Sequence, residues 1–189
     1  MLNHLRPAIA LTLVMTALTG LAYPLSITGL AQALLPEKAN GSLIRKDGNV
    51  IGSALVGQNF SSDRYFWPRP SATGPEPYNA AASSGSNLGA TSVKLRDRVS
   101  ADVERLGVAG AGERLPADAV MASGSGLDPH VSPAYAMAQV ARVAKARGLS
   151  EAVVEDLVAR QAADRILGFI GEPRVNVLEL NLRLDALKT

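Results

Sequence analysis

The N-terminal part of the chain contains a long apolar segment. No charged residue lies between Pro7 and Pro36, and residues 8–35 are rich in Leu, Ile, Val, Ala, Thr and Gly. A helix of about 20 such residues crosses the hydrocarbon core of a bilayer, and a segment inside lipid must satisfy its own backbone hydrogen bonds. We therefore predict a tail at 1–6 and a transmembrane helix at 7–35, with a bend near Pro24.

A cleaved signal peptide is the alternative for this segment. Ala31-Gln32-Ala33 has the small-x-small pattern of a cleavage site. The apolar run, however, is about twice as long as the 7–15 residues of a signal-peptide core, which favours an uncleaved anchor. Lys and Arg counts slightly favour a cytoplasmic C-terminal domain, but this rule weakens before a long folded domain. The sequence alone leaves the orientation open.

Small residues form a stripe on one face of the predicted span. Thr12, Thr16 and Gly20 are spaced four residues apart, so a helix places them on the same side. Small side chains let a second helix approach closely, and threonine hydroxyls can bond across the contact. We expect this stripe to dock on a larger membrane partner. The alternative is that these residues are simply common in membrane helices.

Residues 37–189 have the mixed pattern of a water-soluble domain. The segments 42–44 and 50–56 flank Asp47-Gly48, which predicts a β-hairpin. Residues 58–90 combine four prolines with five aromatic residues. Prolines disfavour regular structure, whereas aromatic area needs burial. We therefore expect a long ordered loop that covers a surface of its own core or of a partner.

Helical periodicity dominates the remainder. Leu95, Val99, Val103 and Leu106 predict one helix, and 118–122 resembles a short strand. Ser132 and Pro133 predict the start of a helix that runs to about 147 and stops at Gly148. Ser150 is a cap for the next helix.

The last segment, 175–187, fits either a strand or a helix. Asn176 followed by Glu179 resembles a capping box, so we predict a helix there. The expected fold class is α+β: one N-terminal transmembrane helix, then a small sheet with three to four helices.

Composition removes several classes of function. The chain of 189 residues has a net charge of +2, no cysteine and only two histidines, His4 and His130. Disulfides, zinc–thiolate sites and multi-histidine metal clusters are therefore excluded. Basic residues alternate with acidic ones, without the basic stripe typical of nucleic-acid binding. A domain of about 150 residues buries enough surface to fold without metal or disulfide.

Candidate chemistry is sparse. Ser123, Ser125, Asp128 and His130 contain the residue types of a nucleophilic triad, but a Gly-rich turn followed by a helix cap explains the same residues better. The pair Trp67 and Arg69 could anchor a docking edge, or could pack locally. Gln139 is interpreted as a solvated or helix-capping residue.

Four stretches in this order resemble a known family. They are residues 57–60 with 64–72 (RYFWPRPSA), 85–89 (GSNLG), 123–130 (SGSGLDPH) and 168–181 (GFIGEPRVNVLELN). Together with the N-terminal span, they resemble the C chain of the bacterial Kdp system, a potassium-transporting P-type ATPase complex. The resemblance covers nearly the whole chain.

The resemblance implies a non-catalytic accessory subunit of the bacterial inner membrane, with its domain on the outer face. Its implied partners are a K⁺-binding channel-like subunit, a catalytic P-type subunit and membrane lipid. The family is described as raising the ATP affinity of the catalytic subunit. No cofactor is expected to bind firmly, and ATP is reached through the catalytic subunit. Gln139 is the one residue that we would assign to a nucleotide contact.

Two other functions stay open at this stage. One is a nucleotide-contacting regulator with a cytoplasmic domain. The other is a secreted hydrolase that uses Ser125 and His130.

Overall fold

The structure is a computed structural model that describes residues 2–108 and 115–187. The chain divides into two compact units, Met1–Ile51 and Gly52–Thr189. The first unit contains the apolar N-terminus, and the second contains most of the polar sequence. The boundary between the compact units lies further along the chain than the end of the predicted span.

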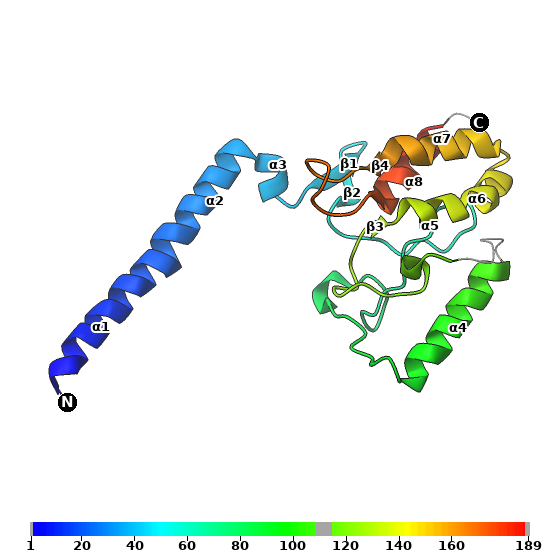
Figure 1. Ribbon diagram of the computed structural model, residues 1–189. Coiled ribbons are helices and arrows are strands. Elements are labelled where there is room, and N and C mark those ends of the chain that lie inside the picture. The colour runs from blue at the N-terminus through cyan, green and yellow to red at the C-terminus, as the bar shows by residue number, and fades with distance from the viewer. Residues whose placement is uncertain (1, 109–114, 188–189) are drawn as a thin grey trace. The chain divides into compact units, whose positions relative to one another are not determined.

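One long helix forms the first part of the N-terminal unit. It consists of α1 (Leu2–Thr16), a π-helical turn (Ala17–Ala22) and α2 (Tyr23–Leu34), which follow one another directly (Figure 1). Residues Asn3–Leu34 have a hydropathy of 1.7 and are long and apolar enough to cross a membrane. Nearly all side chains along this helix are exposed, as a lipid-facing helix requires. The apolar helix predicted from the sequence is confirmed, although it begins earlier, at Leu2.

The π-helical turn lies directly before Pro24. Because proline has no backbone N–H, the carbonyl of Gly20 loses its α-helical donor. The N–H of Tyr23 donates to the carbonyl of Leu18, five residues back, which is π-helical spacing. The proline is thus accommodated by a change of hydrogen-bond register, and the bend expected near Pro24 stays a prediction.

A short helix and a hairpin follow the long helix. The helix is α3 (Pro36–Ala39), and the paired strands are β1 (Leu43–Lys46) and β2 (Asn49–Ser53). Asp47 and Gly48 connect the strands with φ of 51° and 81°. Positive φ at both positions is typical of a type I′ turn, whose twist matches that of the strands. The predicted hairpin is confirmed, with strands that begin and end at slightly different residues.

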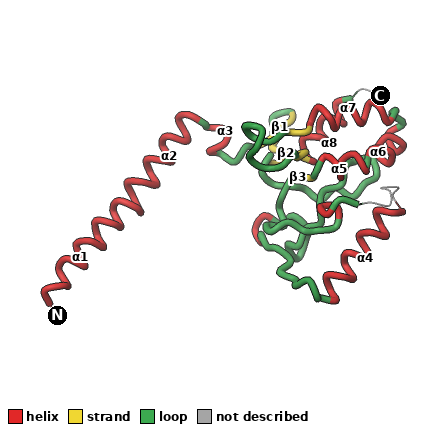
Figure 2. Tube along the Cα trace, viewed as in Figure 1, coloured by secondary structure: helices red, strands yellow, loops and turns green. Residues whose placement is uncertain are grey.

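The sheet of the second unit is built from very short strands. β3 (His130–Val131), β5 (Arg174–Asn176) and β4 (Ala162–Ala163) lie side by side in that order, and neighbours are antiparallel. Figure 2 shows these strands as small yellow segments among helices and loops. The central residue Val175 pairs with Val131 on one side and Ala162 on the other. It is fully buried.

Helices surround this sheet. They are α4 (Val93–Val108), α5 (Pro133–Ala138), α6 (Val140–Arg147), α7 (Glu151–Gln161) and α8 (Val177–Ala186). α7 packs against α5, α6, α8 and β5. In Figure 1, α4 lies at the opposite edge of this unit from α7. The α+β fold class predicted from the sequence is confirmed.

The predicted helix caps are largely confirmed. The hydroxyl of Ser132 accepts from the backbone N–H of Tyr135 at 3.0 Å, and Gly148 ends α6 in the left-handed conformation, with φ of 68°. The side chain of Asn176 caps α8 by accepting from the N–H of Glu179. Ser150 precedes α7, as predicted, but its side chain makes no capping hydrogen bond.

Two sequence predictions are wrong in detail. The segment 118–122 is not a strand, because Ala117–Ala119 forms a 3-10 turn. The carboxylate of Asp118 accepts from the N–H of Ser132 at 2.6 Å and from its hydroxyl at 3.0 Å. These bonds tie the turn to the start of α5, so no strand partner is needed.

The predicted helix from 133 to 147 is also interrupted. α5 ends at Ala138, and its C-cap residue Gln139, with φ of −98° and ψ of −7°, separates it from α6. In the C-terminal segment the helix prediction is confirmed from Val177 onward, whereas 175–176 belong to β5.

The core of the second unit gathers residues from most of its elements. Residues 58–90, all of which the structure describes, contain no α-helix or strand, only a 3-10 turn at Ala80–Ala82. They nevertheless contribute two aromatic side chains to the core. Its largest apolar members are Phe66, Trp67, Leu106, Tyr135, Leu180 and Leu184.

Candidate functional site

The backbone of Phe66 and Trp67 is held in the core by two side-chain amides. Asn181 of α8 accepts from the N–H of Phe66 at 2.9 Å and donates to its carbonyl at 3.0 Å. Gln139 accepts from the N–H of Trp67 at 2.7 Å and donates to its carbonyl at 3.1 Å. Buried backbone groups without partners are costly. The amides therefore allow an irregular segment to pass through the core.

Gln139 is an internal residue. It is 1% exposed, and its amide oxygen also accepts from Nη2 of Arg142 at 2.7 Å. Its interpretation as a solvated residue is wrong, whereas its position at a helix cap is confirmed. All its polar atoms have partners inside the domain. Its contact with nucleotide stays a prediction.

Two guanidinium groups lie over the ring of Trp67. Arg142 is 3.8 Å and Arg105 is 4.6 Å from the ring centroid, an arrangement that gives attractive cation–π contacts. The indole N–H donates to the carbonyl of Ser62 at 3.0 Å. Trp67 is thus packed locally.

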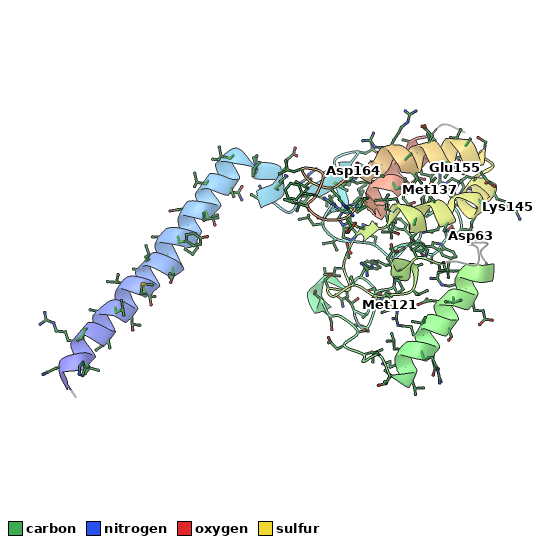
Figure 3. All side chains as sticks on the ribbon, in the orientation of Figure 1. Asp63, Met121, Met137, Lys145, Glu155 and Asp164 are labelled. Atoms are coloured by element: carbon green, nitrogen blue, oxygen red, sulfur yellow. The ribbon has the colours of Figure 1, made fainter. Side chains whose placement is uncertain are left out.

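Arg142 joins the loop to α6. Its Nη1 donates to the carbonyls of Asp63, at 2.8 Å, and Tyr65, at 3.1 Å. Figure 3 labels Asp63 of the loop and Lys145 of α6. Burial lowers the pKa of Arg142 to about 10, so its side chain stays charged at neutral pH.

Arg69 is engaged in a second polar cluster. Its Nη1 lies 3.0 Å from a carboxylate oxygen of Asp128, and its Nε and Nη2 donate to the carbonyl of Met121 at 3.3 and 3.2 Å. The Arg69 side chain is about one-quarter exposed, at 23%. These contacts are local packing, and a role of Trp67 or Arg69 in binding a partner stays a prediction.

Asp128 also holds His130. One carboxylate oxygen accepts from the backbone N–H of His130 at 3.0 Å and lies 3.1 Å from its Nδ1. Burial alone would raise the pKa of Asp128, but the hydrogen bonds from His130 and the charge of Arg69 outweigh it and lower that pKa. A shallow cleft of about 490 Å³ borders Arg69, Ser123, Ser125, Asp128 and His130.

The two serines of this cleft form a turn. The hydroxyl of Ser123 accepts from the N–H of Gly126 at 2.9 Å, and that of Ser125 accepts from the N–H of Leu127 at 3.1 Å. In the described part of the chain, neither hydroxyl bonds the His130 ring. A serine nucleophile needs a base within hydrogen-bond reach, so this geometry fits the turn and not the triad.

Gly126 explains why the turn is rich in glycine. Its φ is 69°, and a Cβ there would lie 2.6 Å from the carbonyl oxygen of Ser84 and 2.7 Å from a methyl group of Thr73. The turn and the loop therefore touch closely.

The stripe in the apolar helix is geometrically real. A Cβ on Gly20 would lie 4.0 Å from the Cγ2 of Thr16, so these positions share a surface despite the π-helical turn. The sequence adds Thr12 on the preceding turn of α1. Contact of this stripe with a partner helix stays a prediction.

Polar residues that sequence reasoning missed fix the other end of the loop. Arg147 donates to the carbonyl of Arg64 at 2.6 Å and to Asp185 at 2.6 Å. The hydroxyl of Tyr65 donates to the other carboxylate oxygen of Asp185 at 3.1 Å. Asn181 was missed as well, although it lies among the apolar residues that α8 buries, where a polar residue signals an internal partner.

Metal ligation is not indicated by the geometry. Within residues 2–108 and 115–187, no three His, Cys, Asp or Glu side chains are grouped so that they could hold an ion.

Comparison with known proteins gives a consistent result. The family model described as "K+-transporting ATPase, c chain" matches residues 5–186. The chain is 59% identical to a potassium-transporting ATPase KdpC subunit of Sorangium cellulosum, with 100% of both chains covered. It is 57% identical to the KdpC subunit of Methylobacterium nodulans, over 99% of this chain and 98% of the relative. The subunit of Allorhizobium ampelinum is 59% identical, over 98% and 97%.

Proposed function

This chain belongs to the family of K⁺-transporting ATPase c chains, and on that premise we propose that it is a non-catalytic accessory subunit of an ATP-driven potassium uptake complex. The observation that carries the proposal is the match over residues 5–186, which includes both the apolar helix and the folded unit. Relatives of 57–59% identity that span nearly the whole chain support it.

The accessory role is supported by what the domain is built to do. Its polar clusters around Trp67 and Arg69 make their hydrogen bonds within the domain, so they hold the loop 58–90 in place. A stable domain attached to an apolar helix suits assembly and bracing of larger subunits.

The membrane arrangement completes the proposal. The helix Asn3–Leu34 spans the bacterial inner membrane and packs through Thr12, Thr16 and Gly20 against membrane-embedded subunits. The domain lies on the extracytoplasmic side, beside the channel-like subunit that binds K⁺. The catalytic P-type subunit is the second partner.

An effect on ATP affinity would then act through conformational coupling. ATP is bound on the cytoplasmic side by the catalytic subunit, so an external domain can influence it only by stabilising one state of the pump over another. The burial of Gln139 favours this indirect route, because its amide is already committed to Trp67 and Arg142.

Complementation tests the proposal directly. In a bacterium that lacks its own copy, the chain should restore growth at limiting K⁺, and an affinity tag on it should co-purify both larger subunits from membranes. Restored growth without co-purification, or co-purification of unrelated proteins, would contradict membership in such a complex.

A regulator with a cytoplasmic domain is the second candidate, favoured by the charge count around the span. The chain has no cysteine, so single cysteines can report topology. We expect a membrane-impermeant maleimide to label Lys145→Cys in intact spheroplasts but to leave Asn3→Cys unlabelled. The reverse pattern would place the domain in the cytoplasm.

The hydrolase alternative is tested separately. Ser125→Ala and His130→Ala should both support full growth at limiting K⁺, since the Ser125 hydroxyl stabilises a turn and the His130 ring pairs with Asp128. A complete loss of function in both variants, with the protein still folded, would revive the alternative.

A further inference from the structure

A hairpin between α7 and β5 has an apolar tip. Ile166, Leu167, Phe169 and Ile170 are 56%, 79%, 74% and 47% exposed. They surround Gly168, so four bulky apolar side chains are presented by five consecutive residues. Exposed apolar groups scattered singly need no explanation, but a contiguous cluster marks an interaction site.

The hairpin is well ordered by its own hydrogen bonds. Ile166 and Ile170 exchange backbone hydrogen bonds of 2.9 Å in both directions. Leu167 and Gly168, with φ of 55° and 80°, make the tight turn. The large exposed fractions of the four apolar side chains place them outside the core of the domain.

Ionised residues flank the base of the tip. Arg165 and Glu172 face each other across the hairpin at 2.6 Å. Asp164 precedes Arg165 directly, and Arg174 follows Glu172 after one proline. Figure 3 labels Asp164 at this base. Two basic and two acidic side chains give no net charge. A convex apolar tip above an ionised collar has the polarity profile of elements that enter the bilayer interface.

The covalent tether keeps this tip near lipid. Residues 35–51 link the apolar helix to the second unit. Even fully extended, a linker of this length spans only about 60 Å, and its α3 and hairpin shorten that reach. Tethering on this scale produces an effective concentration in the millimolar range, so a weak affinity for the bilayer suffices.

We propose that the tip Ile166–Ile170 inserts into the interfacial region of the bilayer and forms a second membrane contact of the domain. This goes beyond the proposed role in potassium uptake, because lipid contact needs no partner subunit. It requires only that the apolar helix resides in the membrane. Because the collar has no net charge, insertion does not require anionic lipid.

Lipid-borne quenching tests the proposal in the full chain. Phe169→Cys carries an environment-sensitive fluorophore in the tip, and Met137→Cys, an exposed apolar position on α5, is the matched control. Each protein is reconstituted into phosphatidylcholine liposomes with or without doxyl-labelled phosphatidylcholine. Interfacial elements penetrate about 5–10 Å, so the label at 169 should lose about half of its emission while the control changes little.

A variant of the tip, and a preparation that contains the larger subunits, distinguish lipid contact from protein contact. Leu167→Asp, which suits the positive φ at that position, should restore most of the emission of the label at 169. Equal quenching of both labels, or of neither, would overturn the proposal. The proposal would also be overturned if lipid did not quench the label at 169, and if its emission changed only when the larger subunits were co-purified with the chain. The tip would then bind protein. Complementation at limiting K⁺ tests the proposed function independently.

Discussion

At the scale of single residues, Gln139 and Asn181 replace a missing β-strand. Each amide offers one acceptor and one donor, which match the N–H and C=O of one buried residue of the loop. Consecutive residues, Phe66 and Trp67, are held in this way from two different helical segments. The loop therefore gains strand-like hydrogen bonds without strand geometry.

Gln139→Ala should lower the free energy of unfolding by about 2–3 kcal/mol. The substitution leaves the buried N–H and carbonyl of Trp67 unpaired and removes an acceptor from Arg142, and each orphaned group costs about 1–3 kcal/mol. Denaturant unfolding followed by the fluorescence of the single tryptophan measures this loss. Met137→Ala, at an exposed neighbouring site, should change stability by less than about 0.5 kcal/mol.

The same variant tests the nucleotide prediction for Gln139. If the amide also contacts nucleotide, Gln139→Ala should, in addition to the loss of stability, shift the ATP concentration at which the assembled pump is half-saturated. Loss of stability without such a shift would assign the residue to the fold.

The partly buried Tyr78 and the fully buried Tyr135 should respond differently to loss of their hydroxyls. The hydroxyl of Tyr78 donates to the carbonyl of Arg69 at 2.6 Å, so Tyr78→Phe should cost about 1–2 kcal/mol. The hydroxyl of Tyr135 has no partner among the described residues, so Tyr135→Phe should be neutral or stabilising. Equal losses in urea unfolding of the two variants would contradict this contrast.

The buried phenol of Tyr135 should make the stability of the fold sensitive to alkaline pH. Burial raises its pKa from 10.0 to about 12, so the folded state favours the neutral phenol. This contribution is complete below pH 10 and is lost as the pH rises to about 12. Unfolding scans across this window should show a smaller loss of stability for Tyr135→Phe than for the unchanged chain.

At the scale of elements, the sequence predicted the turns and helix caps that depend on neighbouring residues. Asp47-Gly48, Ser132-Pro133 and Asn176 act within a few residues, and each gives the predicted turn or cap. The break at Gln139 depends on Trp67, and the turn at Asp118 depends on Ser132. These partners lie far apart in the chain or are linked by no sequence pattern. Hydrophobic periodicity alone therefore could not predict these contacts.

In the candidate site, too, the local features could be predicted from the sequence and the long-range contacts could not. The unusual composition of 58–90 indicated an ordered loop, but its anchors come from helices far along the chain. Arg142 and Arg147 resemble ordinary solvated residues of an amphipathic helix, and their contacts appear only in the folded domain.

The apolar helix carries its own prediction. Gly20→Leu places a bulky side chain on the surface shared with Thr16. If this stripe binds a partner helix, recovery of the larger subunits on a tagged chain should fall about tenfold, since close helix contacts of this kind contribute about 1–2 kcal/mol. Leu18→Phe, a substitution away from the stripe, is the control. Equal recovery with both variants would remove the stripe from the interface.

At the scale of the whole molecule, the two compact units should unfold separately. A helix in a micelle keeps its backbone hydrogen bonds because no water competes for them, whereas the second unit depends on a water-excluded core. Urea should therefore abolish the native fluorescence of Trp67 while circular dichroism retains the helical signal of Asn3–Leu34. Simultaneous loss of both signals would show one cooperative unit.

The amides that hold Phe66 and Trp67 also impose an order on biosynthesis. Gln139 is made 72 residues after Trp67, and Asn181 is made 115 residues after Phe66. At about 5–20 residues per second, the nascent loop waits about 6–23 seconds for its last partner. A chain terminated prematurely before Asn181 would keep open backbone groups that proteases recognise. The second unit can therefore complete its folding only after the final helix, α8, has been synthesised.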